Sequence, residues 1–128
     1  MYTIQINSSS RYPIDRSRIR AVITSVLEKE QLGRSTNVSV AFVGKRKAKQ
    51  LNIDYRDKDY IPNVLSFPYQ DDVEGFIFPD NGQHYLGDMV ICYPIAVEQA
   101  GQQNILVDDW IDQLVTHSME HLLGRHHD

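Results

Sequence analysis

One amphipathic segment near the C-terminal end constrains the fold more than any other feature of the sequence. One side of it carries Ile111, Leu114, Val115, Ser118 and Leu122. These positions recur at the spacing of a single helical face. Asp108 and Asp109 precede them, where the helix dipole favours negative charge, and Gly124 follows, where helices commonly end. The pattern predicts a helix of about 15 residues that ends at Gly124 and packs one face against the rest of the chain.

Shorter patterns predict the other elements. Apolar alternation and β-branched runs indicate strands, and helical spacing indicates a further helix. The strands are expected at 2–6, 37–43, 63–69 and 85–93, and the helix at 15–32. A basic stretch after Gly44 and the segment after Pro94 fit two more helices, and the acidic connection 70–84 is expected to be a loop. The order β-α-β-α-β-β-α-α predicts a single α+β domain over residues 1–128, with a small, mixed, mostly parallel four-stranded sheet covered by helices.

Composition and charge narrow the class of protein. The single Cys92 can form no disulfide within the chain, and no apolar run is long enough for a signal peptide or a membrane span. We therefore expect a cytoplasmic protein with no membrane partner. The net charge is −4, but residues 1–64 carry 12 Lys and Arg against 6 Asp and Glu, whereas residues 65–128 carry 1 against 11. This asymmetry permits an anionic substrate.

Four of the five histidines lie in the last twelve residues, HSMEHLLGRHHD. His117 and His121 are four residues apart, so a helix places them on one face, about 6 Å apart along its axis. Gly124 can reverse the chain, and a third nitrogen can then come from His126 or His127. We choose His127, because it gives the spacing H-x3-H-x2-G-x2-H by which metzincin proteases bind zinc. Three protein ligands leave a fourth position for water, which predicts a catalytic Zn²⁺ rather than a structural one.

The same segment departs from the protease pattern at the general base. Metzincin proteases carry a glutamate directly after the first histidine, and Ser118 stands there in this chain. Glu120 is the nearest acidic residue, but it lies about 100° around the helix from His121 and is expected to face elsewhere. Peptide hydrolysis therefore lacks its expected base.

The histidine segment and two others resemble the YbeY family of metal-dependent endoribonucleases and rRNA maturation factors. The family signature H-G-x-L-H-L-x-G-Y-D-H is similar to H-S-M-E-H-L-L-G-R-H-H, residues 117–127. The segments LNIDYRDKDYIPNVLSFPY (51–69) and YLGDMVICYPIAVEQA (85–100) resemble family segments in the same order. In this signature Ser118 replaces a glycine and His126 replaces an aspartate, which puts a competing ligand beside His127.

The resemblance implies a role for particular residues. His117, His121 and His127 match the metal ligands of the family, and Arg56 matches its functional arginine. A guanidinium can hold two phosphate oxygens in a fixed fork, so Arg56 is expected to orient a phosphodiester and stabilise its transition state. Further substrate contacts are assigned to Lys45, Arg46, Lys49, Lys58 and Ser66. The basic run is also typical of a solvated helix face, and a strand serine is also typical of a local hydrogen bond.

The function implied by the resemblance is a zinc-dependent, single-strand-specific endoribonuclease with a metzincin-like zinc helix at its C-terminal end. It would act on the 3′ end of small-subunit rRNA and in ribosome quality control. Its partners would be RNA and, in addition, the small ribosomal subunit or an assembly GTPase. Two other functions stay open on the sequence. One is a small metalloprotease-like hydrolase, which Ser118 disfavours, and the other is a non-catalytic ribosome-assembly factor that binds RNA and holds a structural metal.

Overall fold

The elements of the fold follow one another in the predicted order. The computed structural model describes residues 1–31, 35–69 and 83–124. Within them lie β1 (Tyr2–Asn7), α1 (Arg16–Glu30), β2 (Ser35–Val43), α2 (Lys45–Arg56), β3 (Val64–Pro68), β4 (Gln83–Cys92), α3 (Tyr93–Gln103) and α4 (Val107–Leu122). Most of the connection predicted as a loop lies outside the described residues, and its last two residues begin β4. None of the helices described is both long and apolar enough to cross a membrane.

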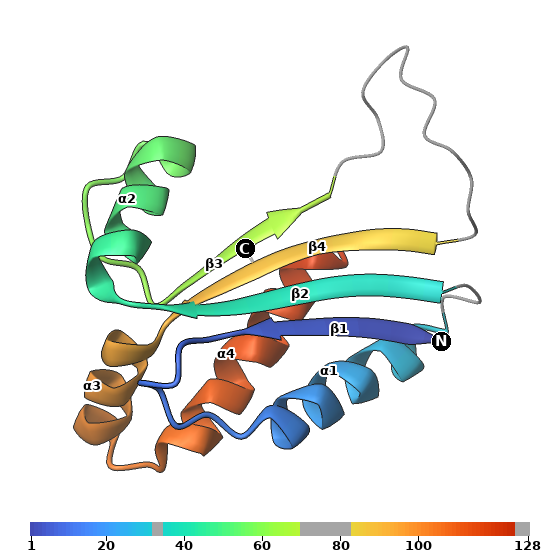
Figure 1. The fold of residues 1–128 in the computed structure, drawn as a ribbon, viewed down its shortest axis with the longest axis horizontal. Coiled ribbons are helices and arrows are strands. Elements are labelled where there is room, and N and C mark those ends of the chain that lie inside the picture. The colour runs from blue at the N-terminus through green and yellow to red at the C-terminus, as the bar shows by residue number, and fades with distance from the viewer. Residues whose placement is uncertain (32–34, 70–82, 125–128) are drawn as a thin grey trace.

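The four strands form one sheet in the order β1-β2-β4-β3 (Figure 1). β1 pairs with β2 and β2 with β4 in parallel, whereas β3 runs antiparallel to β4. Parallel pairing needs a crossover such as α1, but β3 and β4 follow each other along the chain and can pair directly as antiparallel neighbours. The expected small α+β fold is therefore confirmed, and its sheet is mixed rather than mostly parallel.

Helices α1 and α4 cover one face of the sheet (Figure 1). The strands present alternate residues to this face, and β2 alternates buried with half-buried side chains along its whole length. α4 buries the predicted stripe of Ile111, Leu114, Val115, Ser118 and Leu122, and it also buries Met119, which the prediction did not include. Each fully buried aliphatic side chain contributes roughly 1.5–3 kcal/mol, so this face holds α4 firmly on the sheet. The prediction that the last helix packs through one face is confirmed.

Helix α2 extends further than the basic stretch 45–52 that predicted it. It reaches Arg56, because Ala48 and Asn52 are buried one turn apart and anchor its middle. Asp57 then adopts a left-handed conformation with φ 56°, which ends the helix. Arg56 is therefore the last residue of α2, and it stands beside the strand that follows.

Candidate active site

Helix α4 brings His117 and His121 onto one face, as predicted. Their Nε2 atoms are 3.1 Å apart, and their rings meet edge to face with centroids 4.6 Å apart. Two imidazoles on one tetrahedral Zn²⁺ place their nitrogens about 3.3 Å apart, because each Zn–N bond is about 2.0–2.1 Å long. The histidine pair therefore fits a shared zinc ion.

Gly124, after α4, adopts the left-handed conformation that was expected of it. The helix ends at Leu122, and Gly124 has a φ of 83°, a left-handed conformation that glycine adopts without strain. The Gly124 N–H donates to the carbonyl oxygen of His121 at 3.0 Å. His126 and His127 lie outside the described residues, so the choice of His127 as third ligand stays a prediction. Among the residues described, no group of three His, Cys, Asp or Glu is arranged to hold a metal.

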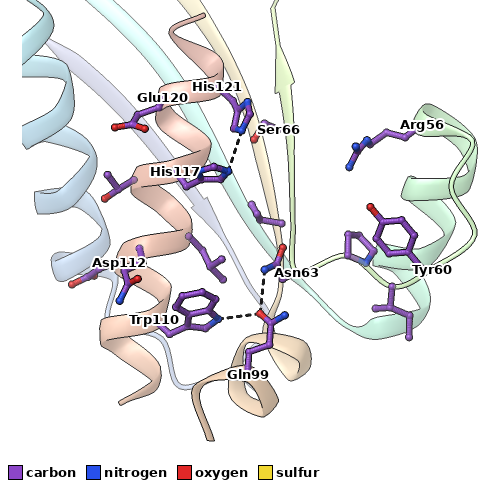
Figure 2. Close-up of a pocket in the computed structure, with 16 residues that line it drawn as sticks. Arg56, Tyr60, Asn63, Ser66, Gln99, Trp110, Asp112, His117, Glu120 and His121 are labelled. Atoms are coloured by element: carbon purple, nitrogen blue, oxygen red, sulfur yellow. Dashed lines mark hydrogen bonds between the residues drawn. The ribbon is translucent and has the colours of Figure 1, made fainter. Parts of the chain in front are cut away.

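Ser118 lies on the side of α4 that faces the sheet. It is fully buried, and its Oγ is 2.6 Å from the Oγ of Ser66 on β3. This hydrogen bond ties α4 to β3 one residue away from His117. Glu120 borders the cleft, but Figure 2 shows its carboxylate directed away from the histidine pair. Neither residue 118 nor Glu120 therefore places a carboxylate beside the two imidazoles.

Arg56 faces the histidine pair across a cleft of about 1110 Å³ (Figure 2). The arginine comes from the end of α2, and the histidines come from α4 on the opposite wall. Ser66 lines the same cleft, so it both borders the site and makes the local hydrogen bond to Ser118. The fold thus brings together Arg56, Ser66, His117 and His121, which the sequence analysis had singled out from three separate segments.

Comparison with known proteins decides the family. The family model for the endoribonuclease YbeY matches residues 4–128. The chain is 41% identical to the endoribonuclease YbeY of Finegoldia magna, over 97% of this chain and 80% of the relative. The chain belongs to the YbeY family. It is also 36% identical to the endoribonuclease YbeY of Cellvibrio japonicus, over 97% of this chain but only 66% of that relative.

A solved structure has a similar fold. A solution structure of a protein from Thermotoga maritima matches with a TM-score of 0.57 and 25% identity, and the match covers 100% of this chain and 75% of that one. The family-model match and the identity to the YbeY relatives confirm the resemblance inferred from the sequence motifs. Membership in the YbeY family supports an RNA endonuclease activity for this chain.

In this YbeY-family chain, the loop after Arg56 is held by a residue that the sequence analysis missed. Asn52 is fully buried, and its Nδ2 donates to the backbone oxygen of Tyr60 at 3.0 Å. The backbone carbonyl oxygen of Asn52 accepts from the Lys58 backbone N–H at 3.2 Å. Asn52 therefore holds both Lys58 and Tyr60 of the turn that follows Arg56. The sequence signal that could have identified Asn52 is an amide at a core-facing position of an amphipathic helix, because a buried polar group needs a hydrogen-bond partner.

The other basic residues assigned to substrate binding lie outside the cleft. Lys45 and Lys49 each face a carboxylate, at 2.6 Å and 3.5 Å respectively. Arg46 borders a second, shallow hollow at the start of α2, and Lys58 is exposed in the turn that follows the helix. Lys45, Arg46 and Lys49 thus lie on an exposed face of α2, and none of these four basic residues lines the cleft.

One carboxylate on the cleft wall is neutralised by an arginine behind it. Arg18 on α1 donates to Asp112 through Nε at 2.9 Å and Nη2 at 2.7 Å, and also to Asp109 at 2.5 Å. The hydrogen bonds to Asp112 and then Asp109 raise the pKa of Arg18 above its already high value. Asp112 is therefore paired with a permanent positive charge and repels an approaching phosphate less than an unpaired carboxylate would.

The lining of the cleft away from the histidines includes four polar or aromatic residues that were given no role from the sequence: Tyr60, Asn63, Gln99 and Trp110. Tyr60 lies in the turn after α2 and Asn63 directly before β3, whereas Gln99 lies in α3 and Trp110 in the first turn of α4. No local sequence spacing therefore connects these residues.

Proposed function

We propose that this chain is a zinc-dependent endoribonuclease that prefers single-stranded RNA. The observation that carries the proposal is that Arg56 and the His117–His121 pair line opposite walls of one cleft (Figure 2). A metal-binding face opposite an exposed guanidinium is suited to holding a phosphodiester while water attacks it. The YbeY-family match supports the same class of reaction.

Each residue of the cleft has a distinct role in this proposal. His117, His121 and His127 would hold the zinc ion, which when bound supplies activation of water near neutral pH. Arg56 donates hydrogen bonds to two non-bridging phosphate oxygens and stabilises the charge that grows on them in the transition state. Ser66, through its hydrogen bond to α4, keeps the histidine-bearing helix in place against β3.

The shape and charge around the cleft support a single strand as substrate. A cleft of about 1110 Å³ accommodates a nucleotide whose base is unpaired, whereas a duplex keeps its bases inside the helix. Lys45, Arg46, Lys49 and Lys58 would contact further phosphates of the same strand along α2. Phosphate contacts add affinity that falls as the salt concentration rises.

The biological setting is proposed from the family resemblance alone. The substrate would be the 3′ end of small-subunit rRNA, in the cytoplasm, and the activity would also serve ribosome quality control. The small ribosomal subunit or an assembly GTPase would be the protein partner. Sedimentation of the tagged chain with small subunits in a cell extract tests this setting independently of the chemistry.

The central test combines metal analysis with cleavage of end-labelled single-stranded and duplex RNA. The unaltered chain should hold about one zinc ion and cleave the single strand. Arg56→Ala should keep the zinc and lose roughly 10²–10³-fold in rate, the usual effect of removing a donor to a developing negative charge. His121→Ala should lose both zinc and cleavage. Arg11→Ala, at an exposed arginine outside the cleft to which the proposal assigns no RNA contact, is the matched control and should cleave within a few-fold of the unaltered chain.

Other outcomes would identify the other functions. Chelator-sensitive cleavage of peptides without cleavage of RNA would indicate a metalloprotease-like hydrolase. Binding of zinc and RNA by an unaltered chain that never cleaves RNA would indicate a ribosome-assembly factor with a structural metal. A preparation without stoichiometric zinc that is also unaffected by His121→Ala would overturn the metal site.

A further inference from the structure

The cleft continues well beyond the histidines along helix α4. Trp110 lies seven residues before His117, close to two full turns, so it occupies the same side of the helix about 10 Å away along the axis. Figure 2 shows Trp110 on one wall of this far end and Tyr60 on the other, with Asn63 and Gln99 between them. The far end therefore has two aromatic rings as walls and two amides at its base.

A hydrogen-bond network fixes how the two amides are oriented. The Trp110 indole Nε1–H donates to Gln99 Oε1 at 3.1 Å, and Asn63 Nδ2 donates to the same oxygen at 3.1 Å. An indole N–H is only a donor, so the Gln99 atom that it meets must be the oxygen. The Asn63 atom that meets this oxygen must then be its NH₂ group. Trp110 thus sets the orientation of both side-chain amides.

This orientation leaves one donor group and one acceptor atom available. Within residues 1–31, 35–69 and 83–124, neither Gln99 Nε2 nor Asn63 Oδ1 has a hydrogen-bond partner. A neighbouring donor and acceptor match the hydrogen-bonding edge of a nucleobase, which also presents a donor next to an acceptor. The faces of aromatic side chains bind unpaired bases by stacking.

We propose that the Trp110 end of the cleft binds one nucleobase of the RNA strand. This inference rests on the proposed function, since it assigns the base end of a substrate whose phosphate lies between Arg56 and the histidines. Trp110 or Tyr60 stacks on the base, and the Gln99 NH₂ group and the Asn63 side-chain oxygen bond its edge. Among the described residues that line this end, the carboxylate is that of Asp112, which is paired with Arg18 and so repels a polynucleotide less than an unpaired carboxylate would.

The chain's single tryptophan makes the test direct. The Trp110 indole N–H gives one side-chain signal in a ¹H–¹⁵N NMR spectrum, and a base stacked on the ring shifts it. The probes are nucleoside 5′-monophosphates, which contain no phosphodiester bond to cleave, and ribose 5-phosphate, which has the same sugar and phosphate without a base. The indole signal should move in a saturable manner with a nucleotide and stay in place with ribose 5-phosphate.

Gln99→Glu tests the amide edge specifically. A glutamate keeps an oxygen to accept from Trp110 and Asn63, but it removes the NH₂ donor. Gln102→Glu is the matched control, because it adds the same charge at an exposed position of the same helix. Gln99→Glu should weaken nucleotide binding roughly five- to tenfold or more, the effect of a lost hydrogen bond, while Gln102→Glu should leave the dissociation constant within about twofold.

The outcomes separate this inference from the proposed function. Equal shifts with nucleotides and ribose 5-phosphate, or no shift with either, overturn the base site even if the chain cleaves RNA. Equal weakening by Gln99→Glu and Gln102→Glu also overturns it, because charge alone would then explain the loss. A nucleotide-specific shift in a chain that never cleaves RNA supports the base site and overturns the nuclease.

Discussion

Gly87 on strand β4 occupies a position with no room for a side chain, and Gly87→Ala tests how the strand meets its neighbours. Its φ is 149°, a backbone conformation that residues with a side chain rarely adopt. An added Cβ would clash with the carbonyl oxygen of Phe67 and lie 2.8 Å from Cδ2 of Leu122. Overpacking costs roughly 1–3 kcal/mol and backbone strain roughly 1–3 kcal/mol more. Gly87→Ala should therefore lower the free energy of unfolding by roughly 2–6 kcal/mol.

Gly101→Ala provides the matched control for this substitution. Gly101 lies in helix α3, and an added Cβ there meets nothing within 4 Å. Alanine is favoured over glycine in a helix by roughly 0.5–1 kcal/mol, so the control should stabilise the chain. Urea unfolding followed by circular dichroism measures both changes. A loss below about 1 kcal/mol for Gly87→Ala, beside a normal gain for Gly101→Ala, would refute the close contact of β4 with β3 and α4.

Three further predictions concern the Ser66–Ser118 hydrogen bond, zinc binding and the Cys92 thiol. Ser118→Ala should lower the free energy of unfolding by roughly 1–2 kcal/mol in urea, because Ser66 loses its partner. Added zinc should raise the melting temperature of the unaltered chain by several degrees and leave that of His121→Ala unchanged, and an equal rise in both would contradict the site. Burial raises the pKa of the Cys92 thiol in the folded chain. Above about pH 8.5, the ordinary pKa of a thiol, the unfolded chain loses this proton while the folded chain keeps it, so the free energy of unfolding falls as the pH rises. Cys92→Ala should reduce the fall in melting temperature between neutral and alkaline pH, and in the unaltered chain the thiol should react with a thiol reagent only on unfolding.

Local spacing was enough to predict much of the fold. The stripe along α4 and the alternation in β2 are properties of consecutive residues, so the helix and the strand could be recognised without knowing their neighbours. The direction of β3 could not be obtained in this way, because it depends on which strand it pairs with. The end of α2 was also missed, since it is set by the burial of Asn52 and by the left-handed Asp57 rather than by the basic stretch.

Some residues of the candidate site could be predicted from local spacing, and others could not. His117 and His121 could be predicted because a helix alone places residues four apart on one face. Arg56 needed the family resemblance, since an exposed arginine at a helix end has no local signature of function. Gln99 and Asn63 are 36 residues apart in the sequence, and only the pairing of β3 with β4 brings them into hydrogen-bond contact.

The antiparallel direction of β3 sets the spacing between the two ends of the cleft. Because Val64 pairs with Ile91, the start of β3 lies where β4 ends and α3 begins, which puts Asn63 next to Gln99. The strand then runs alongside α4 in the same sense, from Asn63 near Trp110 to Ser66 at Ser118. A strand in the opposite direction would carry Asn63 towards the histidines and Ser66 away from them. The distance from the histidines to the two amides is therefore set by the sheet, and changing it requires a change of strand direction rather than of a side chain.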